Sequence, residues 1–196
     1  MPRIITDDER ERTKKSILKH TKQLIIDKKG IRDITVDDII RSAGMGKSTF
    51  YSCFKSKEEC IYGVFECTLA DGLKRAGEIS GLNLSVKEKV LRILREVYLS
   101  EESLTHYMNP AEVGALFRRL PSEYKEMEHK INGGGIMEYA VEVFGINETQ
   151  AETINMFLGC IDYIATYRAV SEQARNESLD AIVVLTAEYI CGINNK

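Results

Sequence analysis

Apolar residues recur at helical spacing from the start of the chain. Between residues 9 and 29 they fall at intervals of three, four and seven between charged flanks, which predicts an amphipathic helix with the inward stripe Ile17, Leu18, Thr21, Leu24 and Ile25. Lys28 and Lys29 suit the negative end of the helix dipole, and Gly30 suits the left-handed position that follows a helix. The pattern therefore predicts a first helix that ends before Gly30.

Two shorter helices are predicted next. Thr35 is a good N-cap, and Asp38 stands three residues later in the capping-box position, so a second helix should run from there to about Gly44. A third helix is predicted over residues 46–53. Two short helices joined by a turn of three or four residues that contains glycine form a helix-turn-helix.

The rest of the chain also has the spacing of helices. Helix starts are predicted at capping residues or at a proline of the first turn: Ser56, Ser85, Asn109, Pro121, Asn147 and Asn176. The helix after Asn147 should reach about Gln173, and the last should reach about Ile193. No strand-like alternation of useful length occurs, so we expect an all-α protein. Its N-terminal three-helix domain should span residues 1–57 and a larger helical domain residues 58–196.

The last two predicted helices carry apolar stripes that are broader than one packing face requires. Deep burial within one chain would explain them, and so would an antiparallel pair that meets its own copy in a four-helix bundle. We favour the homodimer. Its predicted interface consists of Phe157, Ile161, Ile164, Ile182, Leu185 and Tyr189.

The charge is distributed unevenly between the two predicted domains. The whole chain of 196 residues has a net charge of −3, but residues 1–57 carry 14 Lys and Arg against 8 Asp and Glu. The first domain is thus basic and the second acidic. This contrast is typical of a nucleic-acid-binding domain attached to a domain that does not bind nucleic acid. No apolar run approaches the roughly 20 residues of a membrane span, and the N-terminus has no signal-peptide core, so we expect a cytoplasmic protein without membrane contact.

The stretch Gly-Met-Gly-Lys-Ser-Thr at residues 44–49 resembles the end of a nucleotide-binding loop. That loop needs a glycine at the position of Arg41 and a preceding strand, whereas residues 36–43 have helical spacing. We therefore do not expect a nucleotide-binding loop here.

Other function classes have little support in the sequence. Its five cysteines form no Cys-x-x-Cys pair and lie at no zinc-ligand spacing with its three histidines, so we expect no metal and no cofactor. No nucleophile with a base and no pair of carboxylates recurs at catalytic spacing, so we do not expect an enzyme. A thiol-based redox sensor that uses Cys60 and Cys67, two turns apart on one predicted helix, remains an alternative.

The segment 30–59 carries a recognisable combination: Thr-Val-x-x-Ile, Ala-Gly, Lys-x-Thr-Phe-Tyr, Phe and Ser-Lys-Glu-Glu at fixed spacings. Over about residues 10–62 the chain closely resembles the DNA-binding domain of TetR/AcrR-family transcriptional regulators. The resemblance implies a homodimeric, ligand-responsive repressor that binds a palindromic operator in double-stranded DNA. A small-molecule effector would bind the C-terminal domain and release the DNA.

The resemblance also assigns contacts by motif position. Thr35, Tyr51 and Lys57 correspond to phosphate contacts, and the recognition helix would present Lys47, Ser48, Thr49 and Ser52 to the major groove. Short hydroxyl side chains permit a close approach to base edges, and a lysine can contact a phosphate or a guanine. Gly46 replaces the usual serine N-cap, Ser48 replaces a common glycine, and Cys53 is too weak a donor to inherit a phosphate contact.

The effector would lie between the helices of residues 58–170. Candidate lining residues are aromatic side chains along those helices, although plain core is the commoner role for each: Phe65, Tyr98, Tyr107, Phe117, Tyr139 and Phe157. The sequence does not identify a charged partner for the effector.

Overall fold

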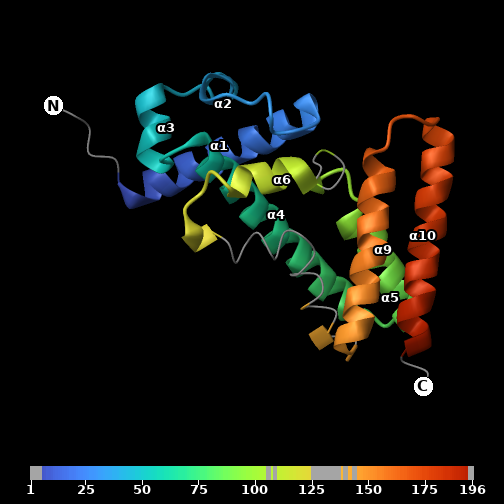
Figure 1. Ribbon diagram of the computed structural model, residues 1–196. Helices are drawn as coiled ribbons and strands as arrows, with labels where there is room; N and C mark the ends of the chain where they lie inside the picture. Colours follow the sequence, from blue (N-terminus) through green and yellow to red (C-terminus); the bar gives the residue numbers. More distant parts are fainter. Residues whose placement is uncertain are drawn as a thin grey trace.

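A computed structural model describes residues 6–104, 107, 110–124, 138, 141–142 and 145–193. Throughout these residues the regular structure is helical, as predicted, and Figure 1 shows two groups of helices joined by one long helix. The elements, in chain order, are α1 (Asp7–Lys28), α2 (Val36–Ala43), α3 (Lys47–Cys53), α4 (Lys57–Ser80), α5 (Val86–Ile93), a π-helical segment (Leu94–Tyr98), α6 (Pro110–Phe117), a 3-10 turn (Ser122–Tyr124), α9 (Glu148–Thr166) and α10 (Glu172–Ile193).

Helix starts in the N-terminal group follow local capping chemistry. The hydroxyl of Thr35 accepts from the backbone N–H of Asp38, and the carboxylate of Asp38 accepts from the N–H of Thr35, which confirms the predicted capping box of α2. At α4 only half of the predicted box forms. Ser56 accepts from the N–H of Glu59, but the carboxylate of Glu59 accepts from the N–H of Lys55 instead of Ser56.

The first hydrophobic core joins α1, α2, α3, the start of α4, and α6. Ile17 and Ile25 of α1, Ile39 of α2 and Phe50 of α3 are at most 1% exposed, so one cluster fixes all three N-terminal helices. The close approach of α1 and α4 depends on Gly63, because a Cβ there would lie 2.9 Å from Cδ2 of Leu18. The three N-terminal helices therefore form one packed platform on α4.

Helix α6 packs into this first core although it belongs to the second half of the chain. Its buried residues Val113, Leu116 and Phe117 join the cluster of the N-terminal helices. Polar contacts reinforce the packing, since the carboxylate of Glu112 accepts from the backbone N–H of Ile31 at 3.4 Å. The first core thus extends beyond residue 57, and the domain boundary at 57/58 stays a prediction.

The second hydrophobic core lies between α5, the π-helical segment, α9 and α10. Helices α9 and α10 lie side by side and antiparallel in Figure 1, with α5 behind them. Ile161 of α9 and Ala187 of α10 are completely buried in this core, and Val183 of α10 is 1% exposed. The helix hairpin is therefore anchored to the rest of the C-terminal group through one shared apolar layer.

The predicted boundary between the last two helices is wrong. Helix α9 ends at Thr166 rather than near Gln173, and α10 begins at Glu172, so Asn176 lies inside a helix and caps nothing. The hydroxyl of Ser171 accepts from the N–H of Ala174 at 3.2 Å, as an N-cap side chain does. The serine three residues before Ala174 was the signal that could have located this helix start.

Candidate nucleic-acid interface

The turn between α2 and α3 sets the angle of the predicted recognition helix. Gly44 ends α2 in the left-handed conformation with φ of 64°, which glycine adopts without steric cost. The N–H of Gly44 donates to the carbonyl of Arg41, and the N–H of Met45 donates to that of Ile40. Met45 also packs against the first core, so both a hydrogen-bonded turn and an apolar contact hold α3 in place.

Helix α3 has one buried and one exposed side. Phe50 is fully buried and lies 5.7 Å, centroid to centroid, from the ring of Phe54, which is 3% exposed. Four of the five candidate DNA-contact side chains of α3 are exposed and Thr49 is half-buried; the exposed ones are Lys47, Ser48, Tyr51 and Ser52. The helix therefore presents an ammonium group and several hydroxyls to solvent while its aromatic side holds it to the core.

Tyr51 lies at the surface and not in the core. Its side chain is 51% exposed, and its ring makes an edge-to-face contact with Phe50 at 5.3 Å between centroids. Within the described part of the chain its hydroxyl makes no hydrogen bond. The ring is thus fixed at its base while the hydroxyl is available to an external acceptor such as a phosphate oxygen.

Two candidate contacts outside α3 already take part in structural hydrogen bonds. The hydroxyl of Thr35 belongs to the capping box of α2, and Nζ of Lys57 donates to the carbonyl of Ile34 at 2.8 Å. These bonds hold the start of α2 and the start of α4 together. An ammonium has three donors, so Lys57 keeps others for a phosphate.

Asp38 stabilises the start of α2, next to the candidate contact Thr35. Hydrogen bonds from Lys28, at 2.8 Å, and from Thr35 hold the pKa of the Asp38 carboxyl well below its usual range. Its charge is thus committed to the cap of α2. The neighbouring Asp37 instead faces α3, where its carboxylate lies 3.4 Å from Nζ of Lys47.

The predicted effector-pocket residues do not gather in one place. Phe65, Tyr107 and Phe117 belong to the first core, whereas Tyr98 belongs to the second. Phe157 makes an edge-to-face contact with Tyr189 at 5.5 Å. Tyr139 lies outside the described residues. The assignment of all six to one pocket therefore remains a prediction without a common cavity to support it.

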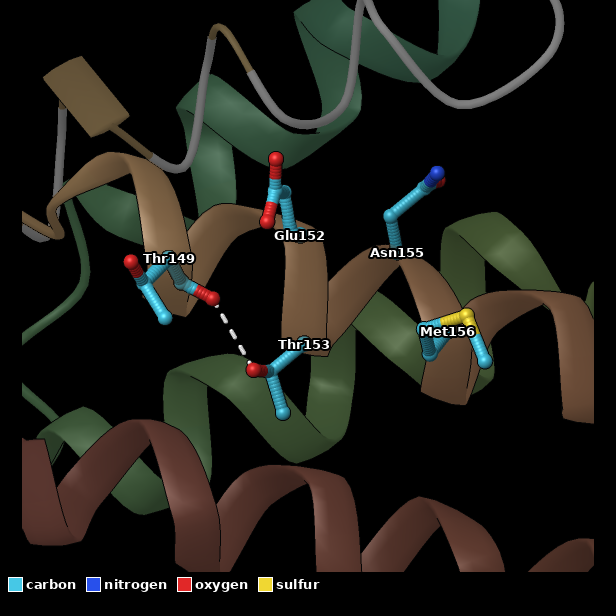
Figure 2. A pocket seen from close by; sticks show the side chains of 5 residues that line it. All are labelled: Thr149, Glu152, Thr153, Asn155 and Met156. Atoms are coloured by element: carbon cyan, nitrogen blue, oxygen red, sulfur yellow. Dashed lines mark hydrogen bonds between the residues drawn. The ribbon is translucent and has the colours of Figure 1, made fainter.

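An open hollow of about 490 Å³ lies on the surface of α9 (Figure 2). Among the described residues, its lining comes from that helix alone: Thr149, Glu152, Thr153, Asn155 and Met156. The hydroxyl of Thr153 donates to the carbonyl of Thr149 at 2.9 Å, so it is used within the helix. None of the five candidate effector residues that the structure describes lines this hollow.

A buried polar pair in the second core was missed from the sequence. The hydroxyl of Tyr98, at the end of the π-helical segment, donates to the carboxylate of Asp162 on α9 at 2.7 Å. Burial raises the pKa of Asp162 to about 6, although the hydrogen bond from Tyr98 acts in the opposite direction. No local motif marks this pair, since its members lie 64 positions apart.

The predicted dimer residues differ in their exposure. Ile161 is completely buried inside the chain, so it cannot contribute a contact to a second copy in this conformation. Phe157, Ile164, Ile182 and Tyr189 are partly buried, and Leu185 is 50% exposed. Helix α9 adds exposed side chains that the prediction left out, at spacings of four and seven, namely Met156, Cys160 and Tyr163, and the exposed Tyr167 follows directly after the helix.

The cysteines do not form the pair that a thiol sensor would need. Cys60 is fully buried, and burial raises the pKa of its thiol to about 12, although a contact from Thr21 partly offsets this. Cys67 is exposed, but it lies two turns further along α4, about 10 Å away at 1.5 Å per residue. A disulfide requires Cα atoms no more than about 7 Å apart, so these two thiols cannot be joined within α4.

Among the described residues, no group of three or more His, Cys, Asp or Glu side chains is arranged to hold a metal ion. Likewise, no helix among the segments described is both long and apolar enough to span a bilayer.

Comparisons with known proteins point in one direction. Residues 17–62 match the family model for "Bacterial regulatory proteins, tetR family". An uncharacterized HTH-type transcriptional regulator of Bacillus subtilis (strain 168), YxbF, is 27% identical over 129 residues, or 62% of this chain. That match covers 34% of the relative, so the chain spans about a third of the length of the curated protein it resembles.

One solved structure resembles almost the whole chain. A putative TetR-family transcriptional regulator from Syntrophomonas wolfei str. Goettingen superposes with a TM-score of 0.60 over 92% of this chain and 96% of that one. The two sequences are 16% identical, so this likeness shows the fold alone.

Proposed function

We propose that this chain, which belongs to the TetR family of bacterial transcriptional regulators, represses transcription as a homodimer on a palindromic DNA operator. A small molecule bound by the helical C-terminal half would release the operator. On this proposal the protein is a cytoplasmic regulator rather than an enzyme. The observation that carries it is the exposed side of α3, a short helix held by buried aromatic rings, within the segment that matches the family model.

The DNA-binding half of the proposal rests on the chemistry of that exposed side. Lys47, Tyr51 and Lys57 supply donors to phosphate oxygens, while Ser48 and Ser52 carry hydroxyls on a helix thin enough to enter a major groove. Thr35 adds a hydroxyl at the start of α2, as the family motif implies. A single helix of seven residues reads few base pairs, so two copies on a palindrome would supply the missing specificity.

The proposal of a dimer rests on apolar side chains of α9 and α10 that are exposed to solvent. Met156 is 71% exposed, Tyr163 65% and Leu185 50%, which is unusual for large apolar side chains on two neighbouring helices. Burying them against a second copy would make a four-helix bundle. The two recognition helices could then meet half-sites about 34–36 Å apart, or a multiple of that distance.

Release would require a path from the C-terminal half to α3. Contacts from the segment around α6 to the N-terminal helices offer one: Glu112 to the N–H of Ile31 at 3.4 Å, Arg119 to Glu58 at 3.4 Å, and Lys22 to Glu102 at 3.3 Å. An effector acts only if it binds one arrangement of these elements more tightly than the other. We expect its binding to shift α4 and α6 together, since both belong to the first core.

The decisive experiment is the capture of genomic DNA fragments by the purified protein, followed by sequencing. The proposal predicts recovery of a palindromic sequence that the protein then binds with steep salt dependence, because Lys contacts to phosphates release counterions. Sedimentation equilibrium on the same preparation should show a dimer. A monomer that recovers no sequence and binds no duplex at low ionic strength would refute the proposal.

A further inference from the structure

We propose that Asp37 competes with DNA for Lys47, so that it sets how tightly the recognition helix holds any duplex. This inference rests on the proposed DNA-binding function. Its basis is the ion pair between Oδ1 of Asp37, in the first turn of α2, and Nζ of Lys47, the first residue of α3. The two atoms are 3.4 Å apart, and the side chains are 65% and 60% exposed.

Asp37 differs from the acidic residue beside it in what it does for the fold. Asp38 caps α2 through Thr35 and binds Lys28, so its negative charge serves the structure. Within the part of the chain that the structure describes, the sole ion-pair partner of Asp37 is Lys47. Its carboxylate is therefore held by a residue of the recognition helix and by nothing in the core.

The same ammonium is the only one that α3 carries. A phosphate that approaches Lys47 would share its ammonium with Asp37 or displace Asp37, and in either case a carboxylate lies next to the polyanion. Like charges a few ångströms apart repel, and this repulsion is screened only beyond a Debye length of about 8–10 Å. Asp37 should thus weaken every complex in which Lys47 contacts a phosphate, whatever the base sequence.

The size of the effect follows from the exposure of the pair. Exposed ion pairs are worth little, and the Asp37→Asn variant should bind a duplex about two- to fivefold more tightly at low salt. Its affinity should also fall more steeply with salt, by up to about 0.9 in the logarithmic slope. The parent protein frees a carboxylate on binding, which can take up a cation from solution and offset one released counterion.

The test uses four full-length variants: Asp37→Asn, Lys47→Ala, the double variant, and Asp33→Asn as a control. Asp33 is exposed in the same module, and its side chain has no ion-pair partner among the residues described, so its variant removes the same charge without freeing Lys47. Affinity for a fluorescent mixed-sequence duplex is measured by anisotropy over a range of salt concentrations. Circular dichroism melts confirm that each variant is folded.

We expect Asp37→Asn to tighten binding in the parent background, to have a smaller effect in the Lys47→Ala background, where only the repulsion between the carboxylate and DNA remains, and to exceed Asp33→Asn. The inference is overturned if both Asn variants tighten binding equally, because net charge would then explain the change. It is also overturned if the Asp37→Asn effect is equally large without Lys47. If the parent and all variants fail to bind any duplex, the proposed function itself fails, which is a different outcome.

Discussion

The side chains of Tyr98 and Asp162 form a hydrogen bond of 2.7 Å between the π-helical segment and α9. Tyr98 is 9% exposed, and burial raises its pKa as well as that of Asp162, which reaches about 6. Within the described residues no cation pairs with this carboxylate. The charged form of Asp162 is therefore disfavoured inside the second core, and we expect the stability of the protein to depend on pH through this carboxyl group.

The first prediction concerns stability between pH 5 and 7.5. Because the folded pKa of Asp162 lies above its ordinary value of 3.8, the native state holds this proton more tightly, and stability is lost as pH rises through about 6. From these two pKa values we expect the free energy of unfolding to fall by about 1 kcal/mol over this range. Urea titrations at several pH values measure this free energy, and Asp162→Asn should remove the fall.

Two other carboxylates act in a separate range. The pKa values of Asp38 and Glu96 are lowered, Glu96 to about 2 by hydrogen bonds from Arg92 and Arg75. Their contributions to stability therefore disappear only as pH falls below about 4.5.

Tyr98→Phe is the matched control for Asp162→Asn. It removes the hydrogen-bond donor to Asp162 and keeps the Asp162 carboxylate, so it should move the loss of stability to higher pH. An Asp162→Asn protein with the slope of the parent would contradict the assignment.

The second prediction tests the exposed side of α3. Lys47→Ala and Tyr51→Phe should each weaken operator binding by about 1–3 kcal/mol, since each removes a donor that the proposal gives to phosphate or to a base edge. Lys74→Ala removes an exposed lysine well along α4 and should leave binding nearly unchanged. Titration with the recovered operator measures all three. Normal affinity in both α3 variants would remove these residues from the contact surface.

The third prediction tests the dimer face. Leu185→Glu places a charge on a half-exposed position of α10, and we expect self-association to weaken at least tenfold, because burying a leucine is worth about 1.5–3 kcal/mol. Leu82→Glu makes the same change at a residue that is 39% exposed in the turn after α4. Sedimentation equilibrium should distinguish the two. Equal dimerisation by both variants would place the interface elsewhere.

The fourth prediction concerns the thiols. Alkylation of the folded protein with iodoacetamide should modify the exposed Cys67 and reach Cys60 only after unfolding, because Cys60 is buried with a raised pKa. A variant without any cysteine should bind and release its operator normally in the presence of peroxide. If the parent protein released its operator in peroxide and the cysteine-free variant did not, the thiol-sensor alternative would be supported instead.

The sequence predicted best those features that depend on neighbouring residues. The start of α2 at Thr35 and its end at Gly44 follow from a capping box and from the left-handed preference of glycine, and both are confirmed. The end of α1 was less well determined. Lys29 adopts the left-handed conformation with φ of 53°, one residue before the expected glycine. A carboxylate oxygen of Glu112 would lie 3.2 Å from a Cβ at Gly30, so this glycine serves a contact with α6 instead.

Features that depend on distant residues could not be predicted. The aromatic residues expected around one effector pocket share helical spacing, but the structure divides them between two cores because α6 packs on the N-terminal helices. The Tyr98–Asp162 pair and the burial of Ile161 likewise depend on how helices meet in space. The helix start at Ser171 is different, because a local cap marks it, but the continuous apolar spacing before it hides the break.

The length of α4 has a geometric consequence for operator choice. Its 24 residues extend about 36 Å at 1.5 Å per residue, from the second group of helices to the start of the DNA-binding platform. A tilt of about 5° at one end would displace the other by about 3 Å, close to the 3.4 Å rise of one base pair. A rotation of α4 that is too small to disturb either core would thereby move the two α3 helices of the proposed dimer out of register with their half-sites.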